Sequence, residues 1–261
     1  MPARKKPVAR TRARKSVPKR ARRMATPRAA AKTVAYVIPA PAMPSLPVTG
    51  TKARFPVRRI YCVGRNYAEH SREMGHDPTR ELPFFFTKAS DSLVQDGGVF
   101  PYPSQTQNVH HEIELVVAIG KGGADIPAES ALNHVYGYAV GLDMTRRDLQ
   151  GEAKKTGRPW EVGKAFEKAA PCSTVVPVGM IGHPSKGRIW LDVNGQRRQQ
   201  GDLSEMIWPI PDIIGHLSRL FALASGDLIF TGTPAGVAAI KPGDTLRGGV
   251  EGVGTLTIHV G

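Results

Sequence analysis

The stretch His111-Glu-Ile-Glu-Leu115 runs directly into the apolar residues 116–119, and together residues 112–119 predict a buried β-strand. Side chains alternate across a strand, so Glu112 and Glu114 point to the same face. Two neighbouring carboxylates repel each other and need a cation or a shared proton to compensate them. The plainer alternative is a solvated edge strand that carries two glutamates, because this spacing is common.

A third carboxylate, Asp143, ends another strand-like run, residues 136–142. Three carboxylates on rigid strands form the kind of oxygen-rich site that Mg²⁺ or Mn²⁺ prefers. We therefore expect Glu112, Glu114 and Asp143 to be metal ligands. His110 and His111 are not expected to bind the metal directly, because an all-carboxylate site suits hard cations; one of them is expected to support the ligands from outside.

The charge of the chain is divided unevenly. The 261 residues include 36 Lys and Arg against 22 Asp and Glu, a net charge of +14. Residues 1–54 hold 15 of the basic residues and no acidic one, which leaves 21 basic and 22 acidic residues, a net of −1, for residues 55–261. The near-neutral body argues against nucleic-acid or other polyanion binding as the main function.

Residues 1–34 form a basic tail rich in Ala, Arg, Lys and Pro, with too few large apolar residues to build a core. Such a composition predicts disorder. Three interpretations of the tail compete: it binds polyanions, it is an organellar transit peptide, or it is an upstream extension with Met24 as an alternative start. We favour the third. Residues 35–58 are expected to form an extended N-terminal arm, and residues 59–261 the catalytic domain.

Cysteine usage and hydropathy indicate the compartment. The two cysteines, Cys62 and Cys172, form no C-x-x-C motif, which fits a reducing compartment and argues against zinc or a disulfide framework. No apolar run reaches the length of a membrane span, and no signal-peptide core follows the basic start. We expect a cytoplasmic protein without membrane contact, or an organellar matrix protein if the tail is a transit peptide.

The body combines many short strands with few helices, and it lacks the regular strand–helix alternation of a Rossmann or barrel fold. Asn194-Gly195 predicts a two-residue β-hairpin turn. We expect an α+β fold that is mainly β. The predicted strands are residues 59–63, 112–119, 136–142, 188–193, 196–200 and 227–230 with a strand pair in 248–260. The predicted helices are 128–134 and 212–223, and residues 67–74 are expected to form a short helix or an ordered loop.

Seven blocks of sequence, in order, resemble the fumarylacetoacetate hydrolase superfamily, and most closely its acylpyruvate and fumarylpyruvate hydrolase branch. The resemblance runs from about Arg59 to the C-terminus. It implies a curled mixed β-sheet roll with flanking short helices. The blocks are Tyr61-Cys-Val-Gly-Arg-Asn-Tyr-Ala-Glu-His70, Pro83-Phe-Phe-Phe-Thr-Lys88, His110-His-Glu-Ile-Glu-Leu115, Gly141-Leu-Asp-Met-Thr-Arg-Arg-Asp-Leu-Gln150, Pro159-Trp-Glu-Val-Gly-Lys164, Val193-Asn-Gly195 and Thr231-Gly-Thr-Pro-Ala-Gly236.

The resemblance also assigns roles to residues. It gives Glu112, Glu114 and Asp143 to the metal, Mg²⁺ or Mn²⁺. His70 and Glu73 are three apart, which on a helix is one face, and alone this is usually an ordinary surface pair. In the resembling hydrolases the pair sits on a lid and activates water. The remaining implied residues are Lys164 at the metal site as a stabiliser of enolate charge, and Arg147, Gln150, Thr233 and Arg65 as substrate contacts, with Asn66 and Lys88 in the pocket wall.

The implied activity is metal-dependent hydrolysis of a carbon–carbon bond in acylpyruvates, which are 2,4-dioxo acids, with fumarylpyruvate as the first-choice substrate. A 2-oxo acid offers its carboxylate and its 2-oxo oxygen as a chelate. Decarboxylation of oxaloacetate is the main alternative, and isomerisation or hydration of related 2-oxo acids is a weaker one. Polyanion binding through the tail is the alternative from a different class. The resemblance further implies a homodimer.

Overall fold

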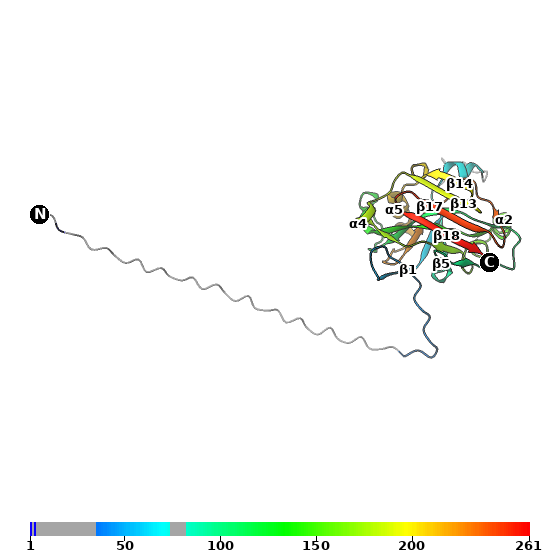
Figure 1. Ribbon diagram of the computed structural model, residues 1–261, viewed down its shortest axis with the longest axis horizontal. Coiled ribbons are helices and arrows are strands. Elements are labelled where there is room, and N and C mark those ends of the chain that lie inside the picture. The colour runs from blue at the N-terminus through cyan, green and yellow to red at the C-terminus, as the bar shows by residue number, and fades with distance from the viewer. Residues whose placement is uncertain (2, 4–34, 74–81) are drawn as a thin grey trace. The chain divides into compact units, whose positions relative to one another are not determined.

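The computed structural model of the protein describes residues 1, 3, 35–73 and 82–261 (Figure 1). The chain divides into two compact units, residues 1–41 and residues 42–261. The described residues of the first unit contain no helix or strand. The basic tail predicted for residues 1–34 lies, apart from residues 1 and 3, outside the described residues, and the rest of this section concerns the second unit.

Four sheets make up the second unit. The largest has eight strands, in the order β4 (Phe85–Lys88), β3 (Ile60–Val63), β15 (Leu228–Phe230), β8 (Ile113–Ile119), β9 (Val135–Leu142), β11 (Ala170–Cys172) and β5 (Leu93–Gln95), with β12 (Val176–Pro177) also paired to β9. The second has five, in the order β14 (Gln196–Asp202), β13 (Arg188–Val193), β17 (Thr245–Val250), β18 (Gly254–Val260) and β6 (Val99–Phe100). The small sheets are β10 (Thr145–Arg146), β7 (Val109–His110) and β16 (Ala239–Ile240), and the pair β1 (Ser45–Pro47) and β2 (Arg54–Pro56).

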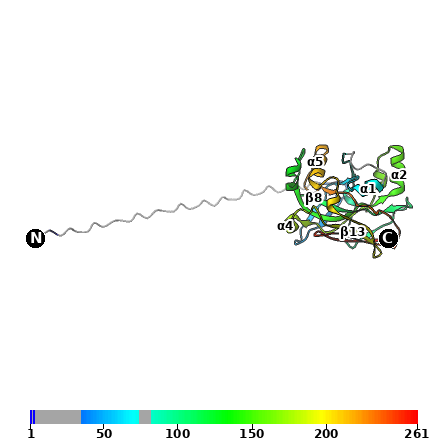
Figure 2. The same cartoon turned by 90° about the horizontal axis from the view of Figure 1, so that it is seen from above.

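Helices are few and short. The longest is α5, and Figure 2 shows α1, α2 and α5 along one side of this unit with β13 on the other. Among the described residues, no helix combines the length and the apolar character that a membrane span requires. The helices are α1 (Ala68–Glu73), α2 (Arg147–Thr156), α3 (Glu161–Lys164), α4 (Val178–Ile181) and α5 (Ile210–Leu220), with 3₁₀ turns η1 (Ser90–Ser92), η2 (Ala128–His134) and η3 (Leu203–Glu205).

The fold is mainly β with a curled mixed sheet, as predicted. Antiparallel pairing dominates the large sheet, but β15 runs parallel to β3, and β11 runs parallel to β5. The predicted hairpin turn is confirmed: Asn194 and Gly195 both have positive φ and join β13 to the antiparallel β14.

The structure shifts the ends of one predicted helix and confirms a short helix at another. The helix predicted for residues 212–223 is α5, which begins at Ile210 and ends at Leu220. Its earlier start follows from Pro211, because proline in the first turn loses no helical hydrogen bond. It ends where Phe221 becomes extended, and Leu223 then bridges to Gly123. Residues 128–134 form the 3₁₀ helix η2.

The side-chain alternation of β8 divides the interior into two apolar clusters. Ile113, Leu115, Val117 and Ile119 belong to the larger core, which also takes residues from the five-stranded sheet and from α5. The intervening Val116 and Ala118 face a second cluster. There they meet Leu46 of β1 and Phe55 of β2, two buried residues of the predicted N-terminal arm, together with residues of β3, β9 and β15. Glu112 and Glu114 continue the face of Val116 and Ala118.

Candidate metal centre

The pairing of β8 with β9 brings the three predicted carboxylates together. Glu114 lies opposite Gly141, and the Asp143 N–H donates to the Glu112 carbonyl over 2.9 Å, so Glu112 and Asp143 are direct neighbours across the two strands. All three side chains are buried, and one carboxylate oxygen from each lies within 4.8 Å of the others. No histidine belongs to this cluster in the part of the chain that the structure describes.

Lysine and arginine side chains partly neutralise the cluster. Lys164, the last residue of α3, is buried and donates from Nζ to Glu112 Oε2 at 2.8 Å and to Asp143 Oδ2 at 2.7 Å. Lys88, at the end of β4, places its Nζ 2.8 Å from Asp143 Oδ1. Arg147, the first residue of α2, donates to Glu112 Oε1. Three cations from three elements therefore surround Glu112 and Asp143.

The surroundings of Glu112 and Glu114 shift the pKa values of these two carboxyl groups in opposite directions. Burial alone would raise the pKa of Glu112, but the charges of Lys164 and Arg147 outweigh it and hold that pKa well below its usual range. Burial, and then the charges of Asp143 and Glu112, raise the pKa of Glu114 well above its usual value. The hydrogen bond that Glu114 receives is the 2.7 Å one from the Gly232 N–H.

The residues of the cluster fit a divalent metal ion. Asp143 Oδ1 is buried and has no hydrogen-bond partner among the described residues, because the contact from Lys88 is an ion pair without hydrogen-bond geometry. Buried carboxylate oxygens without a donor are costly unless a cation compensates them. This oxygen, compensated by Lys88 but without a hydrogen-bond donor, is available as a metal ligand, and a divalent ion would relieve the carboxylate repulsion that helps to raise the pKa of Glu114.

The predicted substrate contacts fall into separate groups. Arg147 donates from its NH1 nitrogen to Gln150 Oε1 at 2.7 Å and lies beside His110, whose pKa is lowered to about 4 by burial and by the Arg147 charge. Thr233 is buried in the loop after β15. Arg65 lies over the ring of Phe84, with its guanidinium carbon 5.0 Å from the ring centroid.

The two residues predicted to activate water lie on α1. His70 is buried, and its charge is one of the causes, after those of Lys164 and Arg147, that lower the pKa of Glu112. Glu73 is the last residue of α1, and its side chain is outside the described part of the chain. Asn66 fixes the chain just before α1, because its amide bonds to the Trp208 and Thr231 carbonyls at 3.0 and 2.8 Å.

Two residues of the centre gave no signal in the sequence. Thr145 accepts from Lys164 Nζ at 2.7 Å, and Gln199 on β14 bonds to Thr233 and to His111. Gln199 is buried in the otherwise polar run Gln196–Asp202. Its burial follows from the packing of the five-stranded sheet against β8, which no local pattern reveals.

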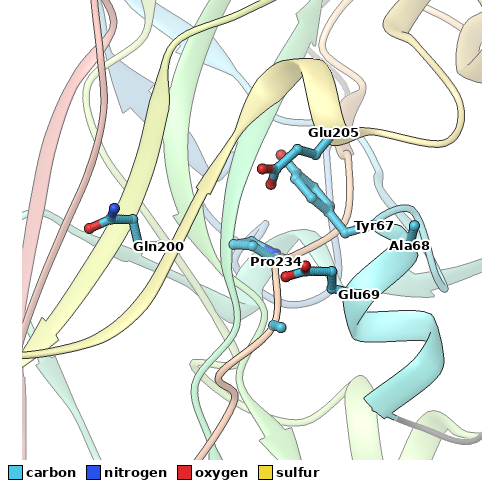
Figure 3. A pocket seen from close by; sticks show the side chains of 7 residues that line it. Tyr67, Ala68, Glu69, Gln200, Glu205 and Pro234 are labelled. Atoms are coloured by element: carbon cyan, nitrogen blue, oxygen red, sulfur yellow. The ribbon is translucent and has the colours of Figure 1, made fainter.

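A pocket of about 230 Å³ adjoins the loop that carries Thr233 (Figure 3). Pro234 and Ala235 form part of it, and the carboxylates of Glu69 and Glu205 flank it from α1 and η3. The neighbouring Tyr67 is buried, and its hydroxyl has no hydrogen-bond partner among the described residues.

Comparison with known proteins assigns the chain to a family. Residues 59–261 match the family model described as fumarylacetoacetate (FAA) hydrolase C-terminal. The chain belongs to the fumarylacetoacetate hydrolase family. Family membership agrees with the resemblance expected from the sequence.

Individual relatives are similar over most of their length. The structure of a fumarylpyruvate hydrolase from Pseudomonas aeruginosa in complex with Mn²⁺ and pyruvate matches with 52% identity and a TM-score of 0.85, covering 87% of this chain and 99% of that one. A fumarylpyruvate hydrolase from a Ralstonia species is 46% identical over 71% of this chain and 96% of its own. The mitochondrial oxaloacetate tautomerase of Homo sapiens is 44% identical over 78% of this chain and 91% of its own.

Proposed function

We propose that this protein hydrolyses the carbon–carbon bond of acylpyruvates with the help of a divalent metal ion. The observation that carries the proposal is the buried cluster of Glu112, Glu114 and Asp143 beside Lys164. It is supported by the similarity to a hydrolase whose structure contains Mn²⁺ and pyruvate. Fumarylpyruvate is the proposed substrate, with fumarate and pyruvate as products, and Mg²⁺ or Mn²⁺ is the proposed ion.

In this proposal the metal ligands are Glu112, Glu114 and Asp143. When bound, the cation supplies two positive charges that hold the oxygens of the 2-oxo acid and stabilise negative charge on them. Arg147, Gln150 and Thr233 bind the substrate carboxylate, and Arg65 contributes from the pocket wall. The Lys164 ammonium, positioned by Glu112 and Asp143, faces the oxygen that becomes an enolate.

The water-activating step belongs to α1. His70, supported by Glu73, removes a proton from water, and the hydroxide adds to the 4-oxo carbon of the substrate. The C3–C4 bond then breaks, with its electron pair moving to the pyruvate fragment as an enolate. The proton held by His70 passes to C3, so that the acid and pyruvate leave with all atoms accounted for.

Decarboxylation or isomerisation of oxaloacetate is the second candidate. Isomerisation is favoured by the identity of 44% to a mitochondrial oxaloacetate tautomerase. Oxaloacetate decarboxylation passes through the same enolate but needs no attacking water. The cluster and Lys164 would serve both reactions, whereas His70 as a water-activating base would serve only hydrolysis.

An assay of the purified protein distinguishes the candidates. Fumarylpyruvate, acetylpyruvate and oxaloacetate are supplied in turn with Mg²⁺, with Mn²⁺ and with excess chelator. The proposal expects the highest kcat/KM with an acylpyruvate, and loss of that activity in the chelator. A kcat/KM that is highest for oxaloacetate would transfer the proposal to the second candidate.

Assembly and location are further parts of the proposal. The family resemblance implies a homodimer, which light scattering on the purified protein would test. We propose a cytoplasmic location. The relative from Homo sapiens is a mitochondrial protein, so import into isolated mitochondria, with and without residues 1–34, tests the organellar alternative for the basic tail.

A further inference from the structure

Gln199 joins three parts of the site that are distant in sequence. It lies on β14, its side chain is buried, and it uses both ends of its amide. Oε1 lies 2.9 Å from His111 Nδ1 and 3.1 Å from the Ile113 nitrogen, at the start of β8. Nε2 lies 2.8 Å from Thr233 Oγ1 and 2.9 Å from the Pro234 carbonyl oxygen. One side chain therefore connects the strand of the metal ligands with the loop of a predicted substrate contact.

Two backbone partners fix which way this amide faces. The Ile113 nitrogen carries a hydrogen and can only donate, so the atom that it contacts must be the amide oxygen. The Pro234 carbonyl can only accept, so the atom that it contacts must be the NH₂ group. If the amide were reversed, its NH₂ group would face the Ile113 N–H, which is also a donor. Its oxygen would face the Pro234 carbonyl, which is also an acceptor.

The orientation of this amide also determines where its other two partners, His111 and Thr233, carry their protons. Because Oε1 only accepts, His111 must donate from Nδ1, which leaves Nε2 as the unprotonated nitrogen of the neutral ring. Because Nε2 of Gln199 donates, Thr233 Oγ1 is the acceptor. The hydroxyl proton of Thr233 is then free to serve another acceptor, and within the described residues it has none.

Thr233 stands beside the carboxylate cluster. It follows Gly232, whose N–H donates to Glu114 Oε2 over 2.7 Å, and Thr231 bonds to the Leu115 carbonyl at 2.9 Å. The oxygens of the cluster are carboxylate oxygens, which repel a ligand carboxylate. Such a ligand therefore needs hydrogen-bond donors that point at its own oxygens. A hydroxyl that accepts from Gln199 keeps its own proton for another partner, and a ligand carboxylate, which can only accept, would receive it.

We propose that Gln199 is a positioning residue that orients the Thr233 hydroxyl as a hydrogen-bond donor to the carboxylate of the 2-oxo acid ligand. The inference rests on the proposed function for the class of ligand. Gln199 acts through Thr233 and does not itself touch the ligand. Its loss therefore weakens ligand binding, and it raises KM more than it lowers kcat, because the carboxylate contact is made equally in the ground state and the transition state.

The test is a double-mutant cycle on the full-length, Mn²⁺-loaded protein, with pyruvate binding measured by calorimetry and fumarylpyruvate kinetics alongside. The variants are Gln199→Met, Thr233→Val and the pair. Gln196→Met is the matched control, because Gln196 is the exposed first residue of the same strand.

We expect each single variant to weaken pyruvate binding about 10- to 100-fold, the range for a hydrogen bond to a charged group. The pair should be no weaker than Thr233→Val alone, and Thr233→Ser should bind nearly as the wild type does.

Each result decides between the inference and its alternatives. Independent, multiplicative losses in the pair, or a Gln199→Met protein that binds pyruvate as tightly as the Gln196→Met control, would overturn the inference. If Gln199→Met does not fold, Gln199→Glu replaces it: this variant still accepts from Ile113 and His111 but draws the Thr233 proton to itself, so unchanged binding would again overturn the inference. A wild-type protein that neither binds pyruvate nor cleaves acylpyruvates would instead refute the proposed function, and the inference with it.

Discussion

The candidate site has two halves that lie on different kinds of secondary structure: the carboxylate cluster lies at two strands, and the predicted base lies on a short helix. Glu114 lies on β8, Glu112 directly precedes β8 and Asp143 directly follows β9, and these two strands pair along seven residues in the middle of the large sheet. His70 stands on α1, a helix of six residues. A helix this short is not stable alone and depends on tertiary contacts such as those of Asn66. The strand-borne half is therefore fixed by the core, and the helix-borne half by a few polar contacts.

The two halves have different chemical roles in the proposed function. The strand-borne half, completed by Lys164, holds charge and would serve every reaction that forms a pyruvate enolate. In the proposed function the helix-borne half supplies the water-activating base, which hydrolysis requires and decarboxylation does not. Family members with different activities can then share the first half and differ in their use of the second. The predictions below test this division, beginning with the largest expected effect.

Glu114→Ala is expected to remove metal-dependent turnover of both acylpyruvates and oxaloacetate. The loss should be about 10³-fold or more, because the ion supplies several kcal/mol of charge stabilisation. Steady-state kinetics with saturating Mn²⁺ measures it, and calorimetric titration with Mn²⁺ should show weakened metal binding. Full activity of this variant, or of the wild type in excess chelator, would contradict the assignment of the cluster.

Lys164→Met is expected to lower both activities together, by about 10²- to 10³-fold, the range for loss of one donor to a developing oxyanion. The side chain keeps its length but loses the charge that contacts Glu112 and Asp143. The ratio of the two kcat values is the informative quantity. A variant that loses hydrolysis but keeps decarboxylation would move Lys164 to the water-activating half.

Gly141→Ala probes the boundary between the carboxylates and the apolar cluster on the same sheet face. Gly141 lies opposite Glu114, and a Cβ there would lie 2.5 Å from Phe230 and 2.6 Å from Val116 side-chain atoms. Overpacking of this kind costs about 1–3 kcal/mol of folding free energy, which thermal or urea unfolding would show. Gly151→Ala in α2 is the control, because nothing lies within 4 Å of its added Cβ. Equal stability of the two variants would refute a tightly packed boundary.

Deletion of residues 1–32 is expected to leave kcat and Tm unchanged. The segment has no apolar face to bury, and its charge belongs to none of the groups at the metal centre. Differential scanning calorimetry and fumarylpyruvate kinetics on the truncated protein measure both quantities. A large drop in Tm would show that the tail stabilises the body.

Much of the strand-borne half could be predicted from the sequence, because strand alternation is a local rule. That rule alone places Glu112 and Glu114 on one face. Asp143 is predicted as a third ligand because it ends another strand-like run, and the family resemblance adds Lys164, which spacing alone does not bring to the cluster. Gln199 and Thr145 could not be predicted, because their contacts depend on how distant sheets pack. The predicted start of α5 lies two residues too late, since a proline in a first helical turn and a proline just before a helix look alike in sequence.

The division between the two halves is tested most directly by the ratio of hydrolysis to decarboxylation in His70→Ala, with Glu69→Ala, its exposed neighbour on α1, as the control. Acylpyruvate hydrolysis should fall about 10²- to 10⁴-fold, the range for loss of a positioned base, while any oxaloacetate decarboxylation falls much less. The ratio in Glu69→Ala should match that of the wild type. An equal fall of both activities in His70→Ala would contradict the account, because the histidine would then position the substrate or the helix instead of activating water.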